Sequence, residues 1–199
     1  MMRRGFAALL GAVLLVTSGC AMADRAGAAV VVDGERYSTQ DLANDFRELD
    51  EALGTAEKPG TMDEVNRAII GIIVADMIMD KVSAAENLDV DMGEVAILRK
   101  NLTDQLGGEA QMLAFAASRG VPPSLLDTVL KQSVFQTELG AKLIGGTDTD
   151  AQAEAALAYL RDIAKTMQIE VSPRFGSWDA TQLVPVAPID DLSKSALTQ

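Results

Sequence analysis

The sequence predicts a mainly α-helical domain of five or six helices, with one short β-strand near each end. Apolar residues recur at helical spacing through most of residues 39–167, and Gly- and Pro-containing breaks separate the periodic segments. Residues 68–82 are apolar almost all round a helical wheel, which is typical of a helix buried on most of its faces. Short runs with strand character stand at residues 29–32 and 168–171.

The first 19 residues are typical of an export signal. Arg3 and Arg4 precede an eleven-residue apolar region over residues 6–16, and small residues follow it. Ser18–Gly19–Cys20 resembles a bacterial lipobox, which predicts that acylated Cys20 holds the protein on the extracytoplasmic side of the cell membrane. The alternative is cleavage at the A-x-A site ending at Ala23, which would release a secreted protein.

Charge and cysteine content narrow the range of partners. Removing Arg3 and Arg4 with the signal leaves 15 basic and 29 acidic side chains, so the mature chain is strongly acidic. This balance argues against nucleic acid as a partner and against electrostatic binding to anionic lipid. Cys20 is the only cysteine, so the domain has no disulfide.

The N-terminal part of the mature chain is expected to be a tether followed by a strand, a turn and a helix. We take residues 20–28 as the tether and 29–179 as the folded domain. Residues 29–32 and Glu35–Tyr37 flank Asp33–Gly34, a strong turn signal, which indicates a small hairpin. Ser38 and Asp41 have the spacing of a helix cap, and they predict a helix over Thr39–Leu53.

Capping residues indicate where the central helix around residues 68–82 begins. Thr61 and Glu64 form a T-x-x-E capping box. Its apolar run from Ala68 to Met79 spans about 18 Å, against roughly 30 Å of bilayer hydrocarbon, so it is too short to cross a membrane. Gly71 lowers helix propensity, and we expect that it permits the close approach of a neighbouring helix.

Three or four further helices are expected after the central one. Asp91 or a neighbour caps a helix that ends at Gly107–Gly108, and the Gly120–Pro123 break separates the next two. A strand over 168–171 follows the last helix. Residues 180–199 contain Pro185 and Pro188 without periodicity, which predicts an extended or disordered tail. The remaining predicted helices are Glu109–Ser118, Ser124–Ile144 and Ala151–Met167.

The sequence offers no recognisable catalytic, metal or cofactor site. It has no histidine, which removes Ser-His-Asp catalysis, Cys-His catalysis and zinc sites of ordinary composition. It also lacks a P-loop and a G-x-G-x-x-G motif. Asp148 and Asp150 begin a D-x-D pattern that fails the spacing of a calcium loop, so capping and solvated surface explain them. A pair of carboxylates doing acid–base work is the enzymatic alternative, and no motif positions one.

Candidate binding residues come from methionine and aromatic side chains. Met112 and Phe115 lie on a short helix beside a Gly/Pro break, where they are candidates for a peptide-facing surface or for core packing. Phe175 and Trp178 follow the closing strand, where they either fix that strand against the helices or contact a peptide.

Two sequence stretches carry a resemblance to a known family. AVVVDGERYSTQDL, from residue 29, resembles the opening of the SurA and trigger-factor-like peptide-binding domain, and QIEVSPRFGSWD, from residue 168, is similar to its closing segment. The resemblance covers residues 29–179. It implies that the two end strands are neighbours, and that the domain is an ATP-independent holdase for unfolded or extended polypeptide segments.

The same resemblance implies that the family's enzymatic part is missing. Full-length members carry a parvulin-type prolyl isomerase domain before the final helix, where this chain has only Gly145–Asp150. The chain also lacks the histidines that parvulin sites use, so we expect no enzyme activity. The alternative function is an envelope scaffold or binding lipoprotein that uses the same fold for one specific folded partner.

Overall fold

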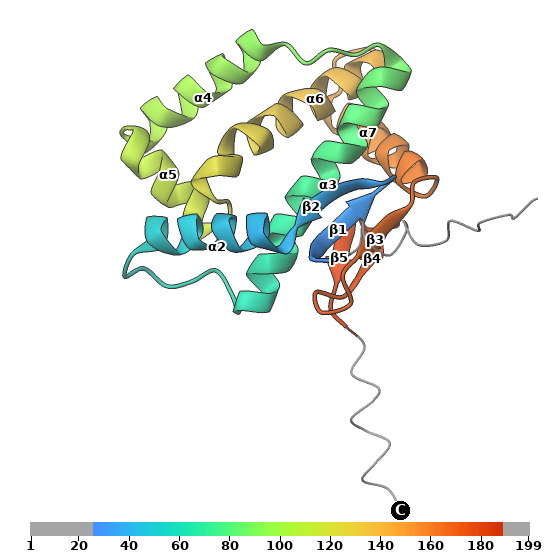
Figure 1. Ribbon diagram of the computed structural model, residues 1–199. Helices are drawn as coiled ribbons and strands as arrows, with labels where there is room; N and C mark the ends of the chain where they lie inside the picture. The colour runs from blue at the N-terminus through green and yellow to red at the C-terminus, as the bar shows by residue number, and fades with distance from the viewer. Residues whose placement is uncertain (1–25, 189–199) are drawn as a thin grey trace, which may run out of the picture.

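The computed structural model describes residues 26–188 as a mainly helical domain with short antiparallel strands (Figure 1). The predicted signal segment, lipid-attachment residue Cys20 and alternative cleavage site at Ala23 lie outside the described residues, as does the end of the predicted tail. The helical content of residues 26–188 confirms the mainly α fold class that the sequence predicts. The described part contains six α-helices: α2 (Thr39–Leu53), α3 (Met62–Glu86), α4 (Met92–Leu106), α5 (Glu109–Ser118), α6 (Leu126–Ile144) and α7 (Thr149–Ala164).

The helix boundaries follow local capping chemistry. Ser38 and Asp41 form a reciprocal capping box at the start of α2, and Thr61 and Glu64 form one at the start of α3. The bounds of α2 and α5 are those the sequence predicts. By contrast, α7 begins two residues earlier than expected, because the Asp148 side chain accepts bonds from the backbone N–H groups of the first helical turn.

Helix α3 runs through the main hydrophobic core. Ile69, Ile70 and Val74 on this helix are fully buried, and Ile78 and Met79 are nearly so. The core around them is closed by residues from α2, α6, α7 and the strands. The prediction of a helix buried on most of its faces is thus confirmed. None of the helices in residues 26–188 is both long and apolar enough to span a bilayer.

The two end strands of the domain are neighbours in one sheet. Strands β1 (Ala28–Val32), β2 (Glu35–Ser38) and β3 (Ile169–Val171) form an antiparallel sheet in the order β2-β1-β3. Val31 stands opposite Glu170 in the β1–β3 register. Val30 and Val32 point into the core, whereas Val31 faces outward. The pairing that the family resemblance implies is therefore present.

The chain continues beyond the sheet as a second hairpin, which corrects the predicted tail. Strands β4 (Ser177–Asp179) and β5 (Val184–Val186) pair antiparallel, with Trp178 opposite Pro185. Proline is tolerated there because β5 is an edge strand. Prediction of an extended or disordered tail is therefore wrong for residues 180–186, and residues 189–199 are outside the described part.

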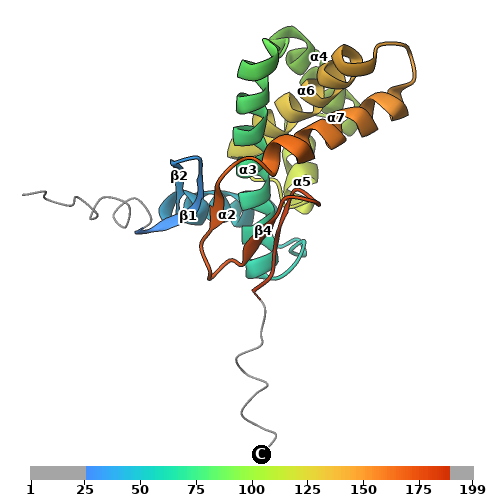
Figure 2. The same cartoon turned by 90° about the vertical axis from the view of Figure 1, so that its right-hand side faces the viewer.

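The hairpin is the neighbour of Gly71, and the expected helix contact at this position is wrong. A Cβ atom on Gly71 would lie 3.4 Å from the Cδ atom of Pro185 in β5. The close neighbour of Gly71 is therefore a strand from the C-terminal hairpin. In the view turned by 90°, this hairpin lies against α3 and α7 runs beside α6 (Figure 2).

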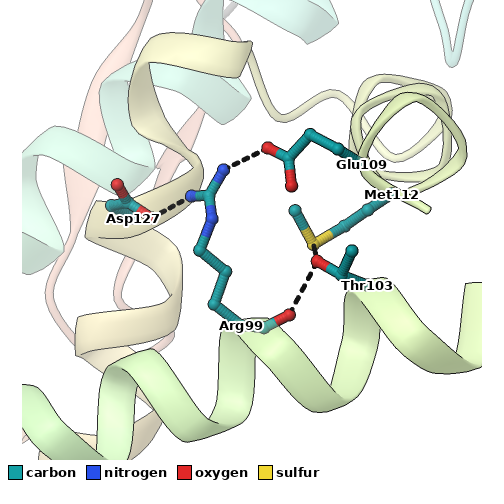
Figure 3. A network of polar contacts seen from close by, with 5 residues as sticks. All are labelled: Arg99, Thr103, Glu109, Met112 and Asp127. Carbon is teal, nitrogen blue, oxygen red and sulfur yellow. Dashed lines mark hydrogen bonds and ion pairs between the residues drawn. The ribbon is translucent and has the colours of Figure 1, made fainter.

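Helices α4, α5 and α6 enclose a second, smaller core. Its buried members are Val95, Met112, Ala116, Leu126 and Leu130. At its edge, the Arg99 guanidinium on α4 makes ion pairs with Glu109 on α5 and Asp127 on α6 (Figure 3). One side chain therefore joins all three helices of this cluster.

Candidate functional site

Met112 does not lie on a peptide-facing surface. Its side chain is 2% exposed in the core of the α4–α5–α6 cluster. The Thr103 hydroxyl lies 3.2 Å from the Met112 sulfur and 2.9 Å from the Arg99 carbonyl oxygen (Figure 3). The peptide-binding assignment of Met112 is therefore wrong, and the alternative of core packing describes it.

Phe115 is accessible but partly covered. Its side chain is 39% exposed on α5, and the Arg119 guanidinium lies 3.6 Å from the ring centroid. This cation–π contact occupies one face of the ring. Phe115 is thus an exposed aromatic on α5, which lies away from β4, the strand that carries Trp178 (Figure 1).

Phe175 and Trp178 occupy different environments, although they are three residues apart. Phe175 is 3% exposed and belongs to the main core, so its position agrees with the alternative in which it fixes the closing strand against the helices. Trp178 on β4 is half-buried and lines an open hollow. Its indole N–H is buried and has no hydrogen-bond partner among residues 26–188. Of the four predicted residues, Trp178 is the one that the structure brings to a concave site.

The hollow beside Trp178 lies at the open side of the three-stranded sheet. It has a volume of about 550 Å³, within the range of about 300–1,000 Å³ that is usual for ligand sites. Val31 of β1 contributes from the outward face of the sheet. The other lining residues are Ala28, the β3 segment Ile169–Pro173, Ser177 and Trp178.

One edge of β3 is unpaired along this hollow. Two backbone hydrogen bonds of 2.9 Å flank the β1–β3 ladder, from Asp33 N–H to the Gln168 carbonyl and from Ser172 N–H to the Ala29 carbonyl. Antiparallel ladders alternate between bonded and non-bonded pairs, so the backbone groups of Ile169 and Val171 point away from β1. No strand in residues 26–188 pairs with β3 on that side.

The turn that leads into the site is held by Asp33. The Asp33 carboxylate accepts from the Gln168 backbone N–H at 2.8 Å and makes an ion pair with Lys81 of α3. The hydrogen bond from Lys81 and that from Gln168 hold the pKa of Asp33 below its usual range. These contacts fix the start of β3 relative to β1 and α3.

A second groove runs between α4 and α6. Its volume is about 430 Å³, and its lining alternates between apolar and polar side chains. Ile97 is 52% exposed at its rim, while Leu98 and Val134 pack against the smaller core beneath it. Glu138 lies at the same rim and accepts from the Asp91 backbone N–H at 3.2 Å.

The acidic side chains of residues 26–188 were candidates for a metal site. The described residues contain no group of three or more His, Cys, Asp or Glu side chains placed to hold a metal ion. Asp76 and Asp80 lie one turn apart on α3, and the Lys131 ammonium lies within 3.3 Å of both. Burial raises the pKa of Asp76, while Lys131 opposes that rise. Lys131 thus occupies the position between these two carboxylates.

The unpaired backbone groups of β3 had no signal in the sequence. The strand itself is visible in the run IEV, but which of its edges is covered depends on the order of strands in the sheet. Ile97 carried a usable signal, because it is an apolar residue outside the stripe formed by Val95, Leu98 and Leu102 on α4.

Comparisons with protein-family models, with curated proteins and with solved structures find no match to this chain.

Proposed function

We propose that the protein is an ATP-independent holdase that binds extended segments of unfolded exported polypeptides on the outer face of a membrane, where the predicted lipid on Cys20 holds it. The observation that supports this function best is the unpaired edge of β3 beside the Trp178 hollow. An extended client segment would add there as a further strand.

The chemistry of such an edge suits clients of varied sequence. Backbone groups of Ile169 and Val171 would bond to the client's backbone, which every polypeptide carries. Each such bond contributes only about 0.5–1.5 kcal/mol net. Most of the affinity would therefore come from client side chains buried against Val31 and Trp178, at about 25 cal/mol per Å² before ordering costs. Weak, reversible and sequence-tolerant binding is what a holdase requires.

Val171→Pro tests the proposal at the strand edge. Proline removes the N–H that points away from β1, and it leaves the β1–β3 hydrogen bonds in place. We expect the variant to fold and to lose at least half of its ability to suppress aggregation of a chemically unfolded, reduced model protein, followed by light scattering.

Val171→Thr is the matched control, because threonine keeps the N–H and a branched side chain of similar shape. It should suppress aggregation as the unmodified protein does. If Val171→Pro retains full suppression and a native melting temperature, strand addition at β3 is contradicted. Absence of any suppression by the unmodified protein at several-fold excess would contradict the holdase function itself.

The alternative function, binding of one folded partner in the envelope, is favoured by the groove between α4 and α6. Its mixed apolar and polar lining suits a defined partner surface better than varied unfolded segments. Ile97→Asp should abolish saturable binding to such a partner and leave aggregation suppression unchanged. The reverse pattern, in which Ile97→Asp stops suppression, would place the holdase surface on α4.

A further inference from the structure

A separate hollow lies where the C-terminal hairpin meets α3, α6 and α7. It has a volume of about 240 Å³, and it does not share residues with the β3 edge or with the α4–α6 groove. Its walls come from consecutive turns of two helices, because Ala75, Ile78 and Met79 on α3 and Leu157, Leu160 and Arg161 on α7 each follow helical spacing. The hairpin contributes Gln182 and Leu183, and α6 contributes Gln136.

The floor of this hollow is part of the main core. Ile78, Met79 and Leu160 are 2%, 1% and 4% exposed, so the hollow reaches to side chains that are otherwise closed to solvent. Leu183 covers one side with its backbone in the left-handed region, at a φ of 58°. That conformation is uncommon for a leucine. The turn that holds Leu183 is fixed by the Asp179 carboxylate, which accepts from the backbone N–H groups of Thr181 and Gln182.

Arg161 is the charged group of the hollow. Most basic side chains of the described part form an ion pair with a carboxylate, as Lys131, Lys142 and Lys165 do. Arg161 forms none within residues 26–188, and its Nε atom is buried there without a hydrogen-bond partner. The residues that line the hollow include no carboxylate. A buried donor without a partner is costly, so an acceptor from a ligand would be favourable.

We propose that this hollow binds a monocarboxylate with a short apolar chain. The planar guanidinium of Arg161 matches a carboxylate in shape and in charge, and the amide of Gln136 offers further donors. The Gln182 amide already donates to the Asp179 carboxylate at 3.0 Å. A single cation suits a monoanion better than a phosphate dianion. The apolar chain would lie against Ile78, Met79 and Leu157. The volume is below the usual range for drug-sized ligands, which excludes long-chain fatty acids and suits a chain no longer than that of octanoate.

Two sources could supply this chemistry: a free medium-chain fatty acid, or the C-terminal residue of a polypeptide that ends in an apolar side chain. Octanoate represents the first source, and n-octanol is its uncharged counterpart. A short peptide that ends in leucine with a free carboxylate represents the second, and the same peptide with a C-terminal amide is its counterpart.

The test is a calorimetric titration of the full chain, exported and processed by its host, with each of these probes below micellar concentration. We expect saturable binding of octanoate or of the free-acid peptide, and at least about tenfold weaker binding of the uncharged counterpart. Arg161→Gln should weaken the charged probe by a similar factor, while Arg161→Lys should retain part of the affinity. Arg67→Gln, on α3 outside this hollow, is the control and should change nothing.

Leu157→Trp tests the apolar part without altering the charge, because the larger side chain should fill the hollow and prevent binding. If Arg161→Gln fails to fold, the Leu157→Trp variant still tests the proposal. Equal binding of octanoate and n-octanol, unchanged affinity in Arg161→Gln, or the absence of saturable binding by both charged probes would overturn the proposal. These outcomes do not depend on the holdase function, since the β3 edge is a separate surface.

Discussion

Two glycines inside helices have opposite surroundings, although the sequence gives no reason to treat them differently. Gly140 on α6 faces α7, and a Cβ atom there would lie 2.4 Å from the Gln152 carbonyl oxygen. Gly71 on α3 faces Pro185, where the added atom would be in ordinary contact at 3.4 Å. The first glycine is required by backbone packing, whereas the second carries only the entropic cost of glycine in a helix.

Alanine substitution should therefore have opposite effects at these two positions. Gly140→Ala should lower the free energy of unfolding by about 2 kcal/mol or more, because the backbone of α7 has to move. Gly71→Ala should raise it by up to about 1 kcal/mol through helix propensity. Urea denaturation of both variants measures the difference. Equal destabilisation by both would show that Pro185 does not tolerate a methyl group at residue 71.

At the scale of single residues, the sequence predicted helix-capping hydrogen bonds correctly, but it did not predict which candidate side chains are buried. The capping roles of Ser38, Thr61 and Asp148 depend on atoms within three residues, and they are confirmed. Assignments to a surface or a core depend on which helices meet. Met112 and Phe115 lie three residues apart on α5, and only the position of α4 and α6 makes one buried and the other exposed.

At the scale of secondary-structure elements, the turn between β1 and β2 fixes the start of β3 through the Asp33 side chain. Asp33 adopts a left-handed conformation with a φ of 47°, which asparagine also tolerates. Its carboxylate reaches Lys81 on α3 and the backbone of Gln168 just before β3. Three elements that are distant in sequence are thereby joined through one side chain.

Asp33→Asn should remove the negative charge of the Asp33 carboxylate and change the backbone preference at this position little. The pKa of Asp33 is lowered in the folded state, so its stabilising effect is present above the unfolded value of about 3.9 and is lost as pH falls through the folded pKa. We expect the variant to be less stable by about 1 kcal/mol at pH 7, since the group is well exposed to solvent.

The measurement is the difference in free energy of unfolding between the two proteins from pH 7 down to pH 2. This difference should shrink below pH 4 and become smaller in high salt, which screens the Lys81 ion pair. A difference that grows on acidification would contradict the role assigned to the Asp33 carboxylate.

The elements that the sequence missed are those defined by distant pairing. Helices α2 to α7 follow from periodicity and caps, which are local. Strand β5 has three residues, contains Pro185 and pairs with a strand that is itself three residues long. Such a segment has no periodic signal of its own, and the face of α3 against which it packs stabilises it. The candidate β3 edge was hidden for the same reason, because strand order is not a local property.

At the scale of the whole molecule, the domain has two hydrophobic cores joined through α6. The larger core surrounds α3 and includes the sheet, and the smaller one lies between α4, α5 and α6. The proposed holdase edge and the Arg161 hollow both border the larger core, whereas the α4–α6 groove borders the smaller one. Substitutions at the different surfaces should therefore affect separate functions.

The C-terminal hairpin completes the larger core, and two truncations test this role. A chain that ends at Pro188 keeps β5 and should unfold with the free energy of the full chain. A chain that ends at Asp179 loses Leu183, Val184 and Pro185 from the surface of α3. Burial of a large apolar side chain contributes about 1.5–3 kcal/mol, and Leu183 is only partly buried, so we expect a loss of about 2 kcal/mol.

Denaturant titration of the two truncated chains measures this loss directly. The shorter chain should also lose binding of octanoate, because Gln182 and Leu183 form one wall of the Arg161 hollow. If the two truncations are equally stable, β5 does not contribute to the core. If both are destabilised, residues 189–199 contribute as well. Strand addition at β3 should persist in the chain that ends at Pro188, because that chain retains Trp178 and both strands of the hairpin.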